Sequence, residues 1–176
     1  MRAGASGDGT GVSGFDASQQ RPDGRGSLVR AIRIATAAHT GQFDKAGLPY
    51  ITHPLRVMGA VDGDDCKIVA VLHDVVEDSD VTLDDLKADG FAEHIIEAVD
   101  AITKGKGESL DESMARVVSV PLARTVKLAD VADNMDPERL ALLPTAVRRR
   151  LLTKYTRTRE LVAAATSGDL SFFGES

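Results

Sequence analysis

Val71-Leu72-His73-Asp74-Val75-Val76-Glu77-Asp78 is the stretch of this sequence that decides the fold. Four ionisable residues stand at the end of an apolar run that otherwise has the pattern of a buried helix. Burial of charged groups without partners costs several kcal/mol. A metal ion would compensate for that cost, so further ligands are expected elsewhere in the chain.

Helical spacing of apolar residues extends on both sides of this stretch. The helix that contains it starts at Asp64 or Asp65 and ends at Asp78-Ser79-Asp80. Further helices are expected from the N-cap Ser27 to about residue 40, and over 51–61, 82–88, 91–102, 110–118, 122–135, from 137 and over 144–165. No segment shows strand alternation bounded by hairpin turns. The pattern predicts an all-α domain of about eight to ten helices.

Composition limits the number of domains and the classes of partner. The 176 residues are 43% hydrophobic, which is enough for one domain with a core. We expect residues 1–26 to be a disordered tail, 27–170 to be the domain and 171–176 to be a C-terminal tail. A net charge of −6 argues against a general nucleic-acid binder or an anionic-membrane binder.

Cysteine content and hydropathy indicate the cellular compartment. Cys66 is the single cysteine, which excludes an internal disulfide and a cysteine-based zinc site. The sequence has no apolar run of membrane-spanning length and no signal-peptide core. We therefore expect a soluble protein in a reducing cytoplasm, with no membrane association.

Two further segments carry candidate ligands. On one helix, His73 and Asp74 would reach one ion from the same edge, and Glu77 and Asp78 follow them by four residues. His53 lies just after a Gly/Pro loop, and Asp130 is surrounded by Val, Leu and Ala with Asn134 one turn later. The set of candidate ligands contains two imidazoles and two carboxylates: His53, His73, Asp74 and Asp130. Such a mixed set suits Mn²⁺, Fe²⁺ or Zn²⁺ better than Ca²⁺.

Each of these residues also has a purely structural interpretation. His53 alone fits a helix start, and Asp130 fits a paired structural acid. Glu77 and Asp78 fit a solvated helix end, and lysines at positions 45 and 127 usually face solvent. The convergence of costly polar groups on three separate helices, each on an apolar background, favours the metal site.

The motifs resemble the HD-domain metal-dependent phosphohydrolases, and within them the alarmone hydrolases. These are the hydrolase domain of RelA/SpoT-type enzymes and its small stand-alone relatives. The resemblance covers about residues 28–160 and is carried by four blocks: His39-x-Gly41-Gln42, Pro49-Tyr50-Ile51-x-His53-Pro54, Leu72-His73-Asp74-x-x-Glu77-Asp78, and Val126-Lys127-Leu128-Ala129-Asp130 with Asn134.

This resemblance implies a role for each candidate residue. The metal ligands, usually for Mn²⁺, would be His53, His73, Asp74 and Asp130. The acidic pair that positions or activates water would be Glu77 and Asp78. The substrate contacts would be Lys45, Asn134 and Tyr155.

The implied reaction is removal of pyrophosphate from the 3′ position of guanosine tetra- or pentaphosphate, which gives GDP or GTP. One departure from the family pattern concerns Asp44, because family members commonly carry Arg there. An acid at this position removes a phosphate or base contact and can change substrate preference. The alternatives are hydrolysis of another nucleotide (an adenine alarmone, a dinucleotide phosphate such as NADPH, or a deoxynucleotide) and a non-catalytic nucleotide-binding module. We expect a monomer or a homodimer.

Overall fold

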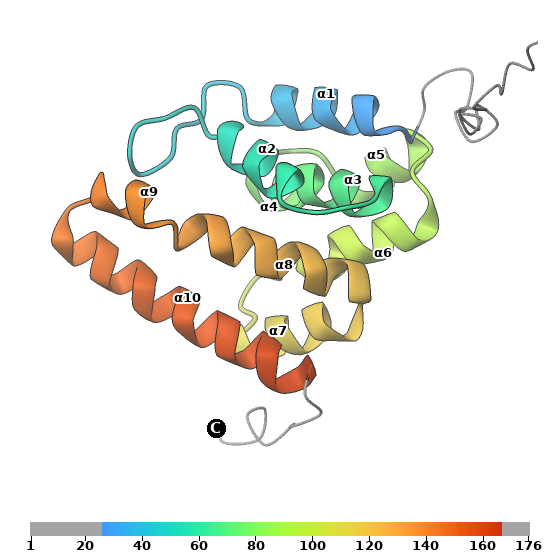
Figure 1. Cartoon of the computed structure of the whole chain (residues 1–176). Helices are drawn as coiled ribbons and strands as arrows, with labels where there is room; N and C mark the ends of the chain where they lie inside the picture. The colour runs from blue at the N-terminus through green and yellow to red at the C-terminus, as the bar shows by residue number, and fades with distance from the viewer. Residues whose placement is uncertain (1–25, 167–176) are drawn as a thin grey trace, which may run out of the picture.

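The computed structural model describes residues 26–166, which form a bundle of ten helices (Figure 1). In chain order they are α1 (Leu28–Ala38), α2 (Thr52–Gly59), α3 (Asp64–Leu72), α4 (Val75–Asp78), α5 (Leu83–Ala88), α6 (Glu93–Ile102), α7 (Leu110–Ser119), α8 (Pro121–Asn134), α9 (Pro137–Ala141) and α10 (Thr145–Thr166). Within these residues, β pairing is limited to one isolated bridge between Phe43 and Pro49. The predicted all-α fold is confirmed.

The predicted terminal tails cannot be compared with this structure, since residues 1–25 and 167–176 lie outside the described part of the chain. The domain bounds 27–170 therefore stay a prediction. Among residues 26–166, no helix has both the length and the apolar character that crossing a membrane requires.

Side-chain caps determine where several helices begin. Ser27 Oγ accepts a hydrogen bond from Arg30 N at 3.2 Å, which caps α1 as predicted. Thr82 and Asp85 form a capping box at the start of α5, with both reciprocal bonds present. Because an N-cap satisfies a backbone N–H that has no partner inside the helix, each is worth about 1 kcal/mol.

One predicted helix is wrong, because the structure divides it into two. The sequence suggested a single helix over residues 64–78, whereas the structure has α3, then a turn at His73 and Asp74, then the short α4. Asp74 has φ −103° and ψ −4°, outside regular helix geometry. The His73 imidazole donates from Nδ1 to the carbonyl of Ala70 at 2.7 Å, so a side chain binds the last turn of α3. The break falls at the two adjacent candidate ligands.

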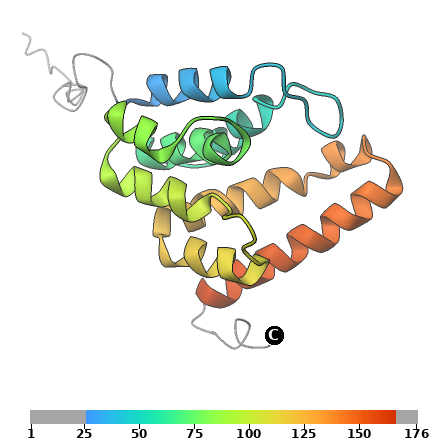
Figure 2. The same ribbon diagram turned by 180° about the vertical axis from the view of Figure 1, so that it is seen from behind.

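The core lies around α3 and α8. Helix α8 packs against α2, α3, α6, α7 and α10, while α3 also contacts α1 and α2. Figure 1 shows α1 and α2 on one side of α8 and α10 on the other, and Figure 2 shows α6 and α7 from behind. The largest fully buried apolar side chains include Leu72, Leu86, Leu161, Val57, Val69 and Val126. Burial of each contributes roughly 1.5–3 kcal/mol.

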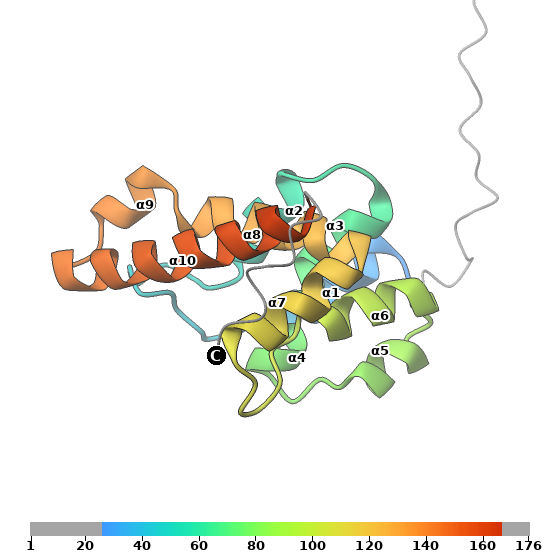
Figure 3. The same cartoon turned by 90° about the horizontal axis from the view of Figure 1, so that it is seen from below.

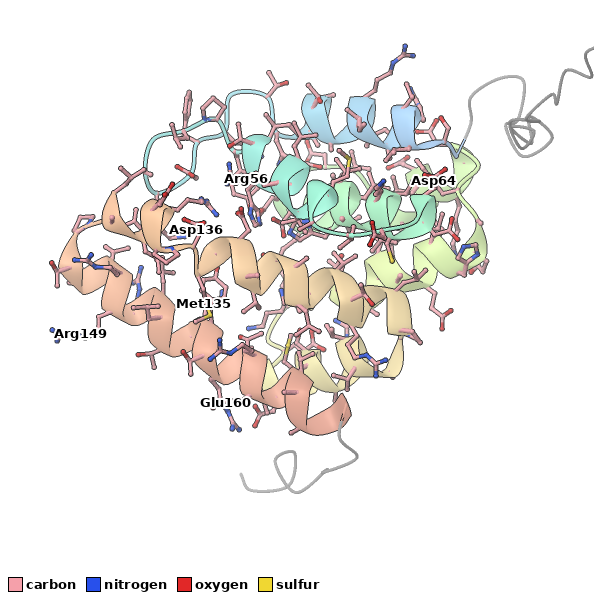
Figure 4. All side chains as sticks on the ribbon, in the orientation of Figure 1. Arg56, Asp64, Met135, Asp136, Arg149 and Glu160 are labelled. Carbon is pink, nitrogen blue, oxygen red and sulfur yellow. The ribbon has the colours of Figure 1, made fainter. Side chains whose placement is uncertain are left out.

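Three elements that are distant in sequence meet because of this packing. The first turn of α2, the turn between α3 and α4, and the second half of α8 all face one another. Seen from below in Figure 3, α10 runs beside α8, and α9 connects the ends of the two helices. Figure 4 draws the side chains on this ribbon, with Arg56 of α2 labelled.

Candidate metal centre and its pocket

The predicted metal ligands come together in the fold. His53 Nε2 lies 3.2 Å from Asp130 Oδ1, and His73 Nε2 lies 3.9 Å from the same oxygen. One donor atom from each of these three buried residues lies within 4.8 Å of the others. Asp74 Oδ2 adds a fourth oxygen, 3.0 Å from His73 Nε2 and 3.8 Å from His53 Nε2.

Hydrogen bonds set both imidazoles in the tautomer that binds metal through Nε2. His53 Nδ1 bonds Asp133 Oδ2 at 2.7 Å, and His73 Nδ1 bonds the carbonyl of Ala70 at 2.7 Å. Both partners only accept, so each Nδ1 must carry the hydrogen. In the neutral imidazole, which is the form that binds a metal, each Nε2 then directs a lone pair into the cluster, as in most metal-binding histidines.

Asp130 is held from both sides. Its Oδ2 accepts from Lys127 Nζ at 2.9 Å, and its Oδ1 accepts from Asn134 Nδ2 at 2.6 Å. Burial raises the pKa of Asp130, but the charge of Lys127 and the contact with His53 outweigh burial, so its pKa lies well below the ordinary value. Burial lowers the pKa of Lys127, whereas the Asp130 carboxylate raises it to about 12. The pair is therefore ionised at neutral pH.

Tyr50 orients Asp74, a contact that the sequence analysis did not assign. The Tyr50 hydroxyl donates to Asp74 Oδ2 at 2.6 Å. Burial and the charge of Asp74 together raise the pKa of Tyr50. Burial raises the pKa of Asp74, but the two imidazoles lower it below its ordinary value. The phenol stays protonated and remains a hydrogen-bond donor.

The charge balance of the cluster fits a divalent cation. Burial lowers the pKa of His53, but the hydrogen bonds to Asp130 and Asp133 outweigh burial and raise it to about 9. Burial also lowers the pKa of His73, but the charge of Asp74 and a hydrogen bond to it outweigh burial and raise that pKa. The His73 Nε2 atom is buried and has no hydrogen-bond partner among the described residues. Two imidazole nitrogens and two anionic carboxylates are the ligand set of a borderline divalent ion.

Glu77 and Asp78 lie beside the cluster on α4. Both are exposed and line the cavity beside the candidate metal ligands. Glu77 Oε2 accepts from the backbone N–H of Lys104 at 3.2 Å, and the carbonyl of Asp78 accepts from Gln42 Nε2 at 2.8 Å. Burial, Asp74 and Glu77 raise the pKa of the Asp78 carboxyl above its ordinary value. That the two acids position or activate water stays a prediction.

The predicted substrate contacts line the same cavity of about 280 Å³. Lys45 comes from the loop after α1, Asn134 from the end of α8, and Tyr155 from α10. Burial and the charge of Asp130 raise the pKa of Tyr155 to about 12, so its hydroxyl stays protonated. The amide of Asn134 already donates to Asp130, which gives this residue a structural role as well. That these three residues contact substrate stays a prediction.

Lys154 is a cavity residue that sequence reasoning missed. Its Nζ lies 5.1 Å from the centre of the Tyr155 ring, on α10. Burial lowers its pKa, and so do the charges of Lys127 and Lys45. Together with Lys45 and Lys127, it makes three lysines that line the cavity.

Asp44, the departure from the family pattern, is tied into its own loop. Its Oδ1 accepts from the backbone N–H groups of Ala46 at 2.8 Å and Leu48 at 3.0 Å. Its Oδ2 forms an ion pair with Arg139 at 3.3 Å. Burial raises the pKa of Asp44, but these bonds together lower it. The carboxylate lines the cavity while its charge is balanced by a guanidinium.

Asp133 is the second residue that sequence reasoning missed. It accepts the Nδ1–H of His53 and also pairs with Arg56 and Arg139. Its position three residues after Asp130, on the same face of α8, was the available signal. Nothing in the sequence pattern singled out Arg139, because it lies on α9 and reaches Asp133 and Asp44 only in the folded chain.

The fold and the site define a class: an all-α protein with a two-histidine, two-carboxylate centre on the floor of a polar cavity. No family model matches the chain. It is similar to a protein of Haemophilus influenzae named guanosine-3′,5′-bis(diphosphate) 3′-pyrophosphohydrolase, with 34% identity over 136 residues. That match covers 67% of this chain and 19% of the relative. A protein of Streptomyces coelicolor named GTP pyrophosphokinase is 34% identical over 121 residues, which cover 61% of this chain and 14% of the relative.

A solved structure has the same fold. It is described as a metazoan ortholog of SpoT that hydrolyzes ppGpp and plays a role in starvation responses, and it matches with a TM-score of 0.65. The match covers 77% of this chain and 84% of the other, at 21% sequence identity. The chain is thus a relative of RelA/SpoT-type proteins, of which it spans between a seventh and a fifth of the length in the two cases above. The predicted resemblance and helical fold are confirmed.

Proposed function

We propose that this chain is a metal-dependent phosphohydrolase that removes the 3′-pyrophosphate of guanosine tetra- or pentaphosphate. The observation that carries the proposal is the pair of imidazoles whose Nδ1 atoms are both occupied and whose Nε2 atoms face Asp74 and Asp130. Lysines and two acids surround this centre in one cavity. Relatives named for the hydrolysis of guanosine bis(diphosphate) support the choice of substrate.

The candidate ligands His53, His73, Asp74 and Asp130 would hold the ion. When bound, a divalent cation neutralises phosphoryl charge and makes a nearby water molecule more acidic. Mn²⁺ is the proposed ion, and Fe²⁺ or Zn²⁺ would suit the same donors.

The acids on α4 would act on the attacking water. Glu77 accepts its proton, with the carboxylate held in orientation by the Lys104 backbone N–H. Asp78 orients the water or assists, and its raised pKa brings it nearer to the range in which a carboxylate works as a base.

Cationic and polar side chains would hold the substrate. Lys45, Lys127 and Lys154 line the cavity and offset the charge of the phosphates. Asn134 and Tyr155 provide hydrogen-bonding groups and, in the case of Tyr155, an aromatic face.

A pyrophosphate-release assay tests the proposal. Mn²⁺-loaded protein is given guanosine tetraphosphate and a panel of other nucleotides, and wild type is compared with Asp74→Asn and Glu77→Ala. Asp74→Asn should lose both Mn²⁺ and activity, whereas Glu77→Ala should keep Mn²⁺ and lose turnover. Asp65→Asn, at the far end of α3, is the matched control and should behave as wild type.

Each other result of this assay would point to a different function or to a different role for Glu77. Hydrolysis of a different nucleotide would keep the reaction class and change the substrate, as the acid at position 44 would allow. If no nucleotide is hydrolysed by Mn²⁺-loaded protein, the enzymatic proposal fails and a nucleotide-binding module replaces it. Wild-type turnover by Glu77→Ala would remove Glu77 from its role as proton acceptor.

The remaining proposals concern the cell and the assembly. We propose that the protein works in the cytoplasm as a monomer or homodimer and does not bind nucleic acid, in agreement with its net charge of −6 and single cysteine. Elemental analysis of protein purified from Mn²⁺-replete cells and light scattering after size-exclusion chromatography would test the metal and the assembly.

A further inference from the structure

The Asp133 carboxylate joins the metal centre to two arginines. Its Oδ2 accepts from His53 Nδ1 at 2.7 Å, and its Oδ1 accepts from Arg56 Nε at 2.7 Å. Arg139 donates to Oδ2 and also, at 2.9 Å, to the backbone carbonyl of Asp133. Only 12% of the Asp133 side chain is exposed, so these contacts are largely shielded from solvent. A carboxylate in this position fixes the orientation of a metal-binding imidazole.

Arg139 continues the connection to the substrate side of the cavity. Its second terminal nitrogen lies 3.3 Å from Asp44 Oδ2. Asp44 in turn binds the backbone N–H groups of Ala46 and Leu48, and its own backbone N–H donates to the carbonyl of Leu48 at 2.8 Å. These bonds close the loop of residues 43–49, which carries Lys45. A continuous chain of contacts therefore runs from His53 through Asp133 and Arg139 to that loop.

The charges along this chain balance. Asp133 and Asp44 supply two negative charges, and Arg56 and Arg139 supply two positive charges. Each guanidinium is a rigid, permanently charged donor, and Arg139 reaches two carboxylates at once because of its fork geometry. Removal of one member leaves a partly buried charge without its partner, which costs more than the loss of a surface ion pair.

We propose that Asp133 and Arg139 are positioning residues that set His53 for the metal and the 43–49 loop for the substrate through one shared connection. Asp44 is, in this arrangement, the loop's attachment point and not a bare acid facing the phosphates. The part of the proposal that concerns the substrate rests on the proposed function. The parts that concern the metal and the loop do not.

Metal affinity tests the first half of the connection. Mn²⁺ dissociation constants are measured by titration calorimetry for wild type, Asp133→Asn and the control Asp65→Asn. Asp65 also pairs with a histidine, His94 at 2.9 Å, but on the surface at the start of α3. Asp133→Asn should bind Mn²⁺ about 10- to 100-fold more weakly. An affinity equal to that of the control would overturn the role of Asp133.

A second variant keeps this test decisive if Asp133→Asn does not fold, as judged by circular dichroism. Asp133→Glu retains the charge that the arginines need, but its longer side chain moves the carboxylate relative to His53. Its Mn²⁺ affinity should also fall, by several-fold. Wild-type affinity in this folded variant would equally contradict the proposal.

Hydrogen exchange tests the second half without any substrate. Arg139→Gln removes the charge that holds Asp44, so the backbone amides of residues 44–48 should exchange at least several-fold faster than in wild type. The Mn²⁺ affinity of Arg139→Gln should stay within about threefold of wild type, because the His53–Asp133 bond remains. Unchanged exchange in the loop would show that Arg139 does not position it.

Kinetics and coupling complete the test. With the nucleotide that the release assay identifies, Arg139→Gln should raise KM about 5- to 10-fold with little change in kcat. Asp44→Asn should act in the same direction, and the double variant should be no worse than the more affected single variant, because both break one link. Additive effects would show two independent contacts. If no nucleotide is hydrolysed, the proposed function fails, while the metal and exchange data still decide this proposal.

Discussion

The floor and the rim of the cavity differ in almost every physical respect. On the floor, His53, His73 and Asp130 are at most 4% exposed, and each forms a short hydrogen bond, with Asp133, Ala70 and Asn134 respectively. On the rim, Phe43 is 66% exposed and Leu142 is 64% exposed. The loop of residues 43–49 is joined to α9 through the Asp44–Arg139 pair at 3.3 Å. In the proposed function, the floor would hold the metal and carry out the reaction, and the rim would contact the substrate.

The largest effect is expected from breaking the floor. His73→Ala removes one nitrogen ligand of the metal. It also removes the imidazole that lies beside the negative charges of Asp74 and Asp130. Mn²⁺ affinity should fall by more than about 100-fold, because loss of an outer-shell partner alone costs 10- to 100-fold. Turnover should fall at least as much, as measured by calorimetry and pyrophosphate release. A variant that binds Mn²⁺ as tightly as Asp65→Asn would show that His73 is not a ligand.

A smaller effect is expected where the floor meets the rim, at Asp78. Asp78→Asn keeps the metal ligands but removes a carboxylate whose pKa is raised by burial, Asp74 and Glu77. We expect kcat to fall by about 100-fold at neutral pH, with unchanged Mn²⁺ affinity. The decrease in wild-type activity on acidification should begin above the ordinary aspartate pKa and should be altered in the variant. Loss of Mn²⁺ together with turnover would instead make Asp78 a ligand.

On the rim, a cation is expected to affect binding more than turnover. Lys154→Met removes a charge from the cavity but keeps a long apolar side chain over Tyr155. KM should rise by about 10-fold and kcat should change little, because the lost interaction holds the substrate in the ground state as well as in the transition state. Arg159→Met, an exposed position on α10, is the control. A decrease confined to kcat would place Lys154 in the chemical step.

The smallest expected effect concerns the acid stability of the connection between floor and rim. Burial raises the pKa of Asp133, but His53 and Arg56 outweigh it and lower the pKa to about 2, against an ordinary 3.8. A depressed pKa stabilises the folded state above about pH 3.8, and this contribution is lost as the pH falls through about 2. After allowance for solvent screening it amounts to roughly 1 kcal/mol. Urea unfolding of wild type and Asp133→Asn at pH 2.5 and 6 should therefore show a smaller difference between the two proteins at pH 2.5, and an equal difference would contradict it.

Local sequence signals predicted most of the helices. Ser27 caps α1 as expected, Thr82 caps α5, and Pro54 lies in the first turn of α2, where the missing N–H does no harm. These features depend on neighbours within four residues, so the sequence contains them directly. The break at His73 and Asp74 was not predicted; there the His73 imidazole binds the carbonyl of Ala70, a contact that apolar spacing does not indicate. Apolar spacing continues through the break and conceals it.

The candidate metal ligands could be predicted from the sequence, whereas the residues that hold them in place could not. His53, His73, Asp74 and Asp130 stood out because charged groups on apolar backgrounds are costly. Asp133 resembled an ordinary polar residue at a helix end, and Arg139 an ordinary surface arginine. Their roles come from contacts over 80 residues, between His53 and Asp133, and over 95 residues, between Asp44 and Arg139.

By itself, the sequence determined which residues are too costly to bury alone and which segments are helical, since both depend on side-chain chemistry and spacing along one chain. Only the tertiary structure decided which Nδ1 atoms are occupied, and therefore which nitrogens face the carboxylates. It also decided that Asp44 meets a guanidinium and not open solvent. Electrostatic pairing depends on distance in space, and that distance is set only when α2, α8 and α9 pack together.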